Sequence, residues 1–132
     1  MSRLSATTIS MVVPLSGLIF NGSGGFTTGS LSYTMTNNTT VTFQESVEYV
    51  TNNSLFLRGT AVINTRLASS SASVRTIFTL KESATQDVAY TTTTRLDSSS
   101  GQTIYTRYGT LTDTLNWQLL RNPVTKATSF LL

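Results

Sequence analysis

The chain has 132 residues, only 11% of them charged, and a formal net charge of +3. This length suits one domain with a modest core, so we expect a single domain over residues 1–132. The sequence contains no Cys and no His, which excludes disulfides, Cys–His zinc sites and Ser–His–Asp triads.

Thr, Ser and Asn take the place of the missing charged residues. Thr favours β-strands because of its branched Cβ, whereas Ser and Asn favour turns. A surface with so little charge has weak self-repulsion, so the chain either has another source of solubility or associates with further copies. The composition therefore predicts an all-β protein.

Apolar and polar residues alternate along most of the chain, which predicts strands with one buried and one exposed face. Pro, Gly, Asn and Ser cluster between these segments and predict short turns, as at Asn21–Gly25. About seven strands joined by hairpin-length turns are typical of an antiparallel meander. The predicted strands cover residues 7–13, 18–20 continuing into 26–36, 41–50, 55–67, 74–81, 88–96 and 102–112.

The C-terminal part has a different pattern. Thr112 or Asp113 can cap a short helix, and the apolar residues of 115–120 have roughly helical spacing. Asn122 followed by Pro123 predicts the start of a second short helix or tail. Helices this short are unstable alone, so they need a sheet to lie on.

These elements predict a mainly β fold with short C-terminal helices. We expect an antiparallel meander sheet of about five strands, preceded by an N-terminal β-hairpin, with the helices packed on one sheet face. The apolar side chains of Leu57, Ile63, Phe78 and Leu80 need more cover than two short helices give. We therefore expect the cover to come across a homodimer, which also protects sheet edges. In the alternative, the N-terminal hairpin covers enough for a monomer.

The strands at 55–67 and 74–81 each have cations on one face, and a serine-rich turn joins them. If they pair as a hairpin, these cations converge, and a later strand adds a tyrosine and an arginine. Such a surface can bind RNA, because cations hold phosphates and a tyrosine stacks on an unpaired base. The simpler interpretation is a solvated sheet face. The predicted RNA-binding residues are Arg58, Thr60, Asn64, Arg66, Arg75, Thr79, Lys81, Arg95, Tyr105 and Arg107.

The acidic residues do not form a catalytic pattern. Glu45 and Glu48 are three apart in a predicted strand and point to opposite faces. Asp87, Asp97 and Asp113 lie in or beside predicted turns, where Asp is common. We therefore expect no enzymatic activity, no catalytic or metal-binding residues and no cofactor.

The order of these elements resembles the coat protein of the single-stranded RNA bacteriophages of the levivirus type. The closest local likeness is Asn64–Arg75, which reads as a strand with an arginine, a serine-rich turn and then a basic strand. Tyr105-Thr-Arg107 is similar to a tyrosine-x-polar step late in the sheet of that family. The resemblance implies an intertwined dimer with a continuous antiparallel sheet, helices outside and RNA on the inner face.

The function implied by this resemblance is that of a structural viral coat (capsid) protein. Its dimers would self-assemble into an icosahedral virion in the cytoplasm of the host bacterium, with the loop near Asp97–Gly101 at symmetry axes. The partners would be further copies and single-stranded RNA, with neither a membrane nor a small-molecule substrate. The alternative is a non-enzymatic β-sandwich adhesion or phage-tail module that binds a ligand through loops, without RNA.

Overall fold

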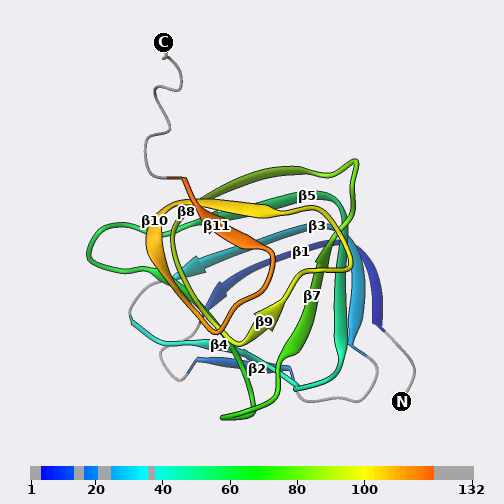
Figure 1. Ribbon diagram of the computed structural model, residues 1–132. Helices are drawn as coiled ribbons and strands as arrows, with labels where there is room; N and C mark the ends of the chain where they lie inside the picture. Colours follow the sequence, from blue (N-terminus) through cyan, green and yellow to red (C-terminus); the bar gives the residue numbers. More distant parts are fainter. Residues whose placement is uncertain (1–3, 14–16, 21–24, 36–37, 121–132) are drawn as a thin grey trace.

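The structure is a computed structural model that describes residues 4–13, 17–20, 25–35 and 38–120. This part of the chain forms strands and no helix (Figure 1). It accordingly contains no helix long and apolar enough to cross a membrane. The strands are β1 (Leu4–Val13), β2 (Leu18–Phe20), β3 (Phe26–Met35), β4 (Val41–Phe43), β5 (Glu48–Arg58), β6 (Thr65–Ser69), β7 (Thr76–Leu80), β8 (Thr85–Thr94), β9 (Leu96–Asp97), β10 (Ile104–Thr112) and β11 (Trp117–Leu119).

The backbone winds repeatedly around one axis, so that each turn lies beside the previous one. We call this arrangement the coil. β1 pairs with β3, where Leu4 lies opposite Phe26, and β2 pairs with β4, where Leu18 lies opposite Val41. The chain thus returns to the same position after 22 residues (4 to 26) and 23 residues (18 to 41). All strand pairs within the described ranges are parallel. Parallel strands need a connection that brings the chain back to its start, and here a further strand and two turns provide it.

The strands β1, β3 and β5 stack on one side of the coil, and β2, β4 and β6 stack on the other. Hydrogen bonds through β8 join both sides into one curled sheet. Its strand order is β1-β3-β5-β8-β6-β4-β2. β8 links the sides because its first half pairs with β5 and its second half pairs with β6. The sheet curls so strongly that it resembles half of a barrel (Figure 1).

The predicted antiparallel meander is wrong. β6 and β7 flank the serine-rich turn, yet β6 pairs with β4 and β8, while β7 pairs with β5 and β9. β1 and β2 likewise pair with β3 and β4, so they form no N-terminal hairpin. The alternation of apolar and polar residues indicates only a buried and an exposed face, which the wall of a coil also has. The short turns of small residues serve as corners of the coil.

The predicted helix after Asp113 is also wrong. Leu115 forms a parallel bridge with Asp97, and β11 pairs with the start of β10. Asp113 and Asn116 have φ values of 49° and 64°, which a right-handed helix does not allow. The second helix, predicted from Asn122 onward, lies outside the described residues.

Trp117 fixes this last turn of the coil. Its indole is 5% exposed, and Nε1 donates a hydrogen bond of 2.7 Å to Oγ of Ser98. Its ring also packs 5.9 Å from the ring of Phe78, measured between centroids. The apolar spacing that predicted a helix therefore reflects one buried tryptophan and leucines that stay partly exposed.

The interior of the coil has two parts. An aromatic cluster consists of rings from successive turns, and Phe26, Tyr49 and Phe78 lie opposite one another in β3, β5 and β7. Phe20 and Phe43 complete this cluster. The second part consists of inward-facing threonines, which we call the threonine rows. The buried threonines are Thr28, Thr51, Thr65, Thr76, Thr79, Thr91, Thr93 and Thr106.

Both ends of the curled sheet belong to the first turn of the coil. β1 is the terminal strand on one side and β2 is the terminal strand on the other. Among the described residues, no strand pairs with the outer edge of either one. β1 has ten residues, whereas β11 at the opposite end of the coil has three.

Candidate ligand-binding face

The structure does not place the ten predicted RNA-binding residues on one surface. Thr79 lies inside the coil, 1% exposed, and donates a 2.8 Å hydrogen bond to Oε2 of Glu48. Thr60 and Asn64 stabilise the loop between β5 and β6. Oγ1 of Thr60 accepts the N–H of Ile63 at 3.0 Å, and Nδ2 of Asn64 donates to the Thr60 carbonyl at 2.9 Å.

Two of the predicted cations, Arg75 and Arg95, make local contacts, and a third, Arg66, is partly buried. Arg75 forms an ion pair with Asp113. Nε of Arg95 donates a 2.7 Å hydrogen bond to the carbonyl oxygen of Ser71. Nε of Arg66 is buried and has no hydrogen-bond partner in the described part of the chain. The RNA-binding role of these residues stays a prediction.

Of the ten residues, Arg58, Tyr105 and Arg107 come to the same part of the surface, while Lys81 is exposed in the turn between β7 and β8. The two arginines share the carboxylate of Asp87. Nη2 of Arg58 is 2.9 Å from Oδ2 of Asp87, and Nη2 of Arg107 is 2.8 Å from Oδ1.

The strand register explains this ion-pair cluster. Ala89 of β8 lies opposite both Arg58 of β5 and Arg107 of β10. Asp87 is two residues earlier in β8, and side chains two apart in a strand share a face. The three charged side chains are 33% to 48% exposed, so solvent screens the ion pairs and their contribution to stability is small. Their main effect is to hold both guanidinium groups in place.

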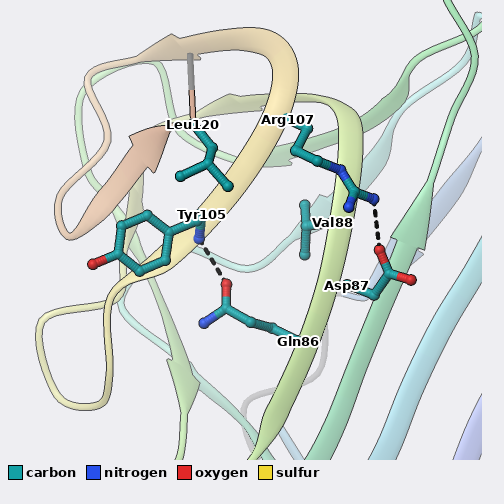
Figure 2. A pocket seen from close by; sticks show the side chains of 6 residues that line it. All are labelled: Gln86, Asp87, Val88, Tyr105, Arg107 and Leu120. Atoms are coloured by element: carbon teal, nitrogen blue, oxygen red, sulfur yellow. Dashed lines mark hydrogen bonds and ion pairs between the residues drawn. The ribbon is translucent and has the colours of Figure 1, made fainter. Parts of the chain in front are cut away.

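A hollow of about 470 Å³ lies beside this cluster, between β8 and β10 (Figure 2). Oε1 of Gln86 accepts the N–H of Tyr105 at 2.7 Å, and Nε2 of Gln86 donates to Oε1 of Gln102 at 2.9 Å. The side chain of Gln86 is therefore fixed at the floor of the hollow. The lining residues are Gln86, Asp87, Val88, Tyr105, Arg107 and Leu120.

A second hollow of about 240 Å³ shares Leu120 with the first and is also lined by Tyr108, Gly109 and Leu119. The ring of Tyr108 stacks on Tyr90, with 4.8 Å between centroids and 20° between planes. Two successive turns thus present tyrosines at the same corner. We call the two hollows, with Tyr105 and Tyr108, the tyrosine face.

The backbone at this corner is unusual. Tyr90 and Tyr108 have φ values of 52° and 66°, in the left-handed region that few residues other than Gly and Asn adopt. Gly109 follows with a φ of 130°, and a Cβ there would lie 2.0 Å from the carbonyl oxygen of Thr91. The close approach of β8 and β10 therefore requires glycine at this position and directs Tyr108 outward.

The tyrosine face combines apolar walls with a few fixed polar groups, which is typical of a binding site. Within the described ranges, no group of three or more Asp and Glu side chains could hold a metal ion. The prediction that the chain is not an enzyme stays a prediction.

Comparisons with protein-family models, curated proteins and solved structures gave no match. Geometry alone therefore supports the interpretation of this face. Sequence reasoning missed Gln86, Asp87, Tyr108 and Leu120, and it placed Asp87 beside a turn, whereas Asp87 lies inside β8. An acidic residue within a strand is a signal for a charged partner on a neighbouring strand, but which strands are neighbours was not readable from the sequence.

Proposed function

We propose that this chain is a structural subunit that pairs with a second copy through the outer edge of β1. Natural proteins protect such edges with charges, prolines, bulges or a covering segment. The sequence of β1, LSATTISMVV, contains no charged residue and no proline. β1 also keeps one register with β3 from Leu4 to Val13, without a bulge. This ten-residue edge is the observation that supports the proposal.

The best match for this edge is the β1 edge of another copy. β11, at the opposite end of the coil, has only three residues and cannot pair along the length of β1. Two β1 edges have equal length, and their antiparallel pairing about a two-fold axis forms a closed dimer. The outward-facing residues Thr8, Ser10 and Val12 are uncharged, so they do not repel one another across the axis.

Self-association is the part of the coat-protein hypothesis that this edge supports. The antiparallel sheet and the first C-terminal helix, on which the resemblance was based, are not what the described residues form. Assembly of dimers into an icosahedral shell, RNA packaging and location in a virion stay predictions. Electron microscopy of the purified protein and analysis of co-purified RNA would test them.

Sedimentation velocity over a range of protein concentrations tests the dimer. Val12 is 65% exposed on β1, so Val12→Lys adds a charge to the uncharged edge strand without disturbing the core, and lysine on an edge strand opposes pairing. We expect this change to raise the dimer dissociation constant about tenfold or more. Val62 is 78% exposed in the loop between β5 and β6, so Val62→Lys is the matched control and should leave the constant unchanged.

A wild-type chain that remains monomeric at its highest soluble concentration would contradict the proposal. Equal weakening of the dimer by Val12→Lys and Val62→Lys would also contradict it, because the effect would then come from net charge rather than from β1.

A further inference from the structure

We infer that the tyrosine face binds a neutral oligosaccharide chain, with one sugar ring against Tyr105 and a further ring against Tyr108. This inference goes beyond self-association and does not depend on it, because the face lies on β8, β10 and β11 and not on β1. Four features support it: the two aromatic platforms, their rigid support, the mixture of donors and acceptors, and the distribution of charge.

The aromatic platforms suit the apolar face of a sugar ring. Tyr105 is 40% exposed and Tyr108 is 55% exposed, so each presents much of its ring to solvent. A sugar ring has a face of C–H groups that can pack on an aromatic ring, as other apolar surfaces do. Val88 and Leu120 extend this apolar contact in the first hollow, and Leu119 and Leu120 extend it in the second.

The ring of Tyr108 and the backbone that carries Tyr105 are held in place before any ligand binds. Tyr108 stacks on Tyr90, and its backbone is fixed at the corner by Gly109. The backbone N–H of Tyr105 donates to Gln86, which is itself held by Gln102. Binding therefore orders few side chains, and a fixed platform costs less entropy on binding than a mobile one.

The polar groups of the first hollow match hydroxyl groups, which both donate and accept. Nη2 of Arg107 contacts Asp87, whereas the other guanidinium N–H groups of Arg107 have no hydrogen-bond partner among the described residues. These groups can donate to a sugar oxygen. The carboxylate of Asp87 can accept from a sugar hydroxyl at the same time.

The charges favour a neutral ligand over a nucleic acid. The carboxylate of Asp87 stands in the lining of the first hollow and offsets one of the two adjacent arginines. A phosphate placed there would face that negative charge. The second hollow is lined by Tyr108, Gly109, Leu119 and Leu120, with no cation to bind a phosphate. A nucleic acid strand along this face would therefore leave phosphates unmatched.

The two hollows adjoin, because both are lined by Leu120. A single sugar ring would fill only one hollow, whereas a chain of rings would contact both tyrosines. The geometry thus favours an oligosaccharide over a monosaccharide.

Isothermal titration calorimetry with defined probes tests this inference. The probes are maltohexaose, cellohexaose, the hexamer of N-acetylglucosamine and a mannose hexamer, each compared with its monosaccharide, and hexauridylate as an RNA probe. We expect at least one hexasaccharide to bind, and Tyr105→Ala to weaken its binding about tenfold. Tyr108→Ala should weaken the hexasaccharide but leave the monosaccharide unchanged, because a single ring in the first hollow contacts Tyr105 alone.

Ile19→Ala is the control, since Ile19 is an apolar residue 64% exposed on β2 and outside both hollows. Its binding should equal that of the wild type. Leu120→Arg serves as a second variant should Tyr105→Ala fail to fold, because the new side chain obstructs both hollows from an exposed position. It should abolish hexasaccharide binding.

Failure of every neutral probe to bind would overturn the inference. Equal weakening by Ile19→Ala and Tyr105→Ala would also overturn it. Salt-sensitive binding of hexauridylate, without binding of any sugar, would also overturn it and favour the RNA-binding prediction instead.

Discussion

The aromatic cluster and the threonine rows fill the same coil with different chemistry. In the cluster, the rings of Phe43 and Tyr49 lie 4.9 Å apart and those of Phe43 and Phe78 lie 5.6 Å apart. In the rows, most hydroxyl groups take part in a hydrogen bond. Oγ1 of Thr76, for example, lies 2.9 Å from the carbonyl oxygen of Gln44, and Oγ1 of Thr79 donates to Oε2 of Glu48, whereas Oγ1 of Thr65 has no partner among the described residues. Both regions are almost completely buried.

This difference separates two tasks of a core. Aromatic burial removes much apolar area from water and supplies most of the stabilising free energy. A buried hydroxyl contributes little net energy, but it is costly when it lacks an acceptor. Where the partner lies on another segment, as it does for Thr76, Thr79 and Thr93, a different register would separate the pair, so these threonines favour one register of the coil. Three substitutions test this division.

Phe43→Ala should have the largest effect. Phe43 is 0% exposed and packs against rings from four other strands, β2, β3, β5 and β7. Removing its ring leaves a cavity, and we expect a loss of about 4 kcal/mol in the free energy of unfolding. Urea denaturation measures this loss, with the exposed Phe56→Ala as the control. A loss below about 1 kcal/mol would mean that the cluster is not the main source of stability.

Thr76→Val should have an intermediate effect. Oγ1 of Thr76 lies 3.1 Å from the carbonyl oxygen of Phe43 and 2.9 Å from that of Gln44. Valine keeps the shape but removes the donor. The Phe43 carbonyl retains the N–H of Ser70 at 2.7 Å, so the expected loss is only about 1 kcal/mol.

The control for this substitution is Thr110→Val, since Thr110 is exposed on β10. Its free energy of unfolding should stay within about 0.5 kcal/mol of the wild type. If Thr76→Val matched the control, the threonine rows would contribute nothing to the choice of register.

Tyr33→Phe should have the smallest effect near neutral pH. The hydroxyl of Tyr33 is buried and has no hydrogen-bond partner among the described residues. Removing it leaves no unpaired group, so we expect a change of less than about 1 kcal/mol, in the stabilising direction.

At alkaline pH the same pair of proteins should diverge. Burial, and secondly the charge of Tyr49, raises the pKa of the Tyr33 hydroxyl well above its ordinary value. Ionisation is therefore favoured in the unfolded chain, and the wild type loses stability as the pH rises above about 10. Tyr33→Phe lacks this loss, so its stability relative to the wild type should increase with pH in urea denaturation series. If both proteins lost the same free energy of unfolding above that pH, the result would contradict the burial of the Tyr33 hydroxyl.

Several strands follow directly from the local sequence. The predicted strand at 26–36 corresponds to β3 (Phe26–Met35), and that at 102–112 contains β10 (Ile104–Thr112). Alternation also placed Leu31, Tyr33, Leu57, Phe78 and Leu80 in the interior, where the structure has them. These predictions succeeded because a strand buries every second side chain whatever its neighbours are.

Other strands were drawn too long, because they contain corners. The predicted strand at 41–50 divides near Ser46, which has a φ of 64°. The predicted strand at 55–67 divides after Arg58, where a Cβ on Gly59 would lie 2.5 Å from the carbonyl oxygen of Tyr90. The space available at Gly59 depends on the next turn of the coil, which local sequence does not describe.

The candidate site was also predicted only in part, because its residues come from strands whose pairing the local sequence does not show. Sequence reasoning named Arg58, Tyr105 and Arg107 as parts of one surface, but it grouped them with Thr79, which faces the interior. The carboxylate that joins the two arginines belongs to Asp87, on a strand between theirs. The sequence predicted that the strand of Arg58 pairs with the strand at 74–81. It therefore did not predict that Asp87 of β8 lies beside Arg58.

By itself, the sequence determined that the chain forms strands, which side chains they bury, and that little charge opposes association. These properties depend on neighbours one or two residues away. Only the tertiary structure decided that the strands run parallel, that β1 has an open edge, and that Tyr105 and Tyr108 line adjoining hollows. Each of those depends on pairing between segments about 13 to 31 residues apart, where many registers satisfy the same alternation and only the stacking of whole turns selects one.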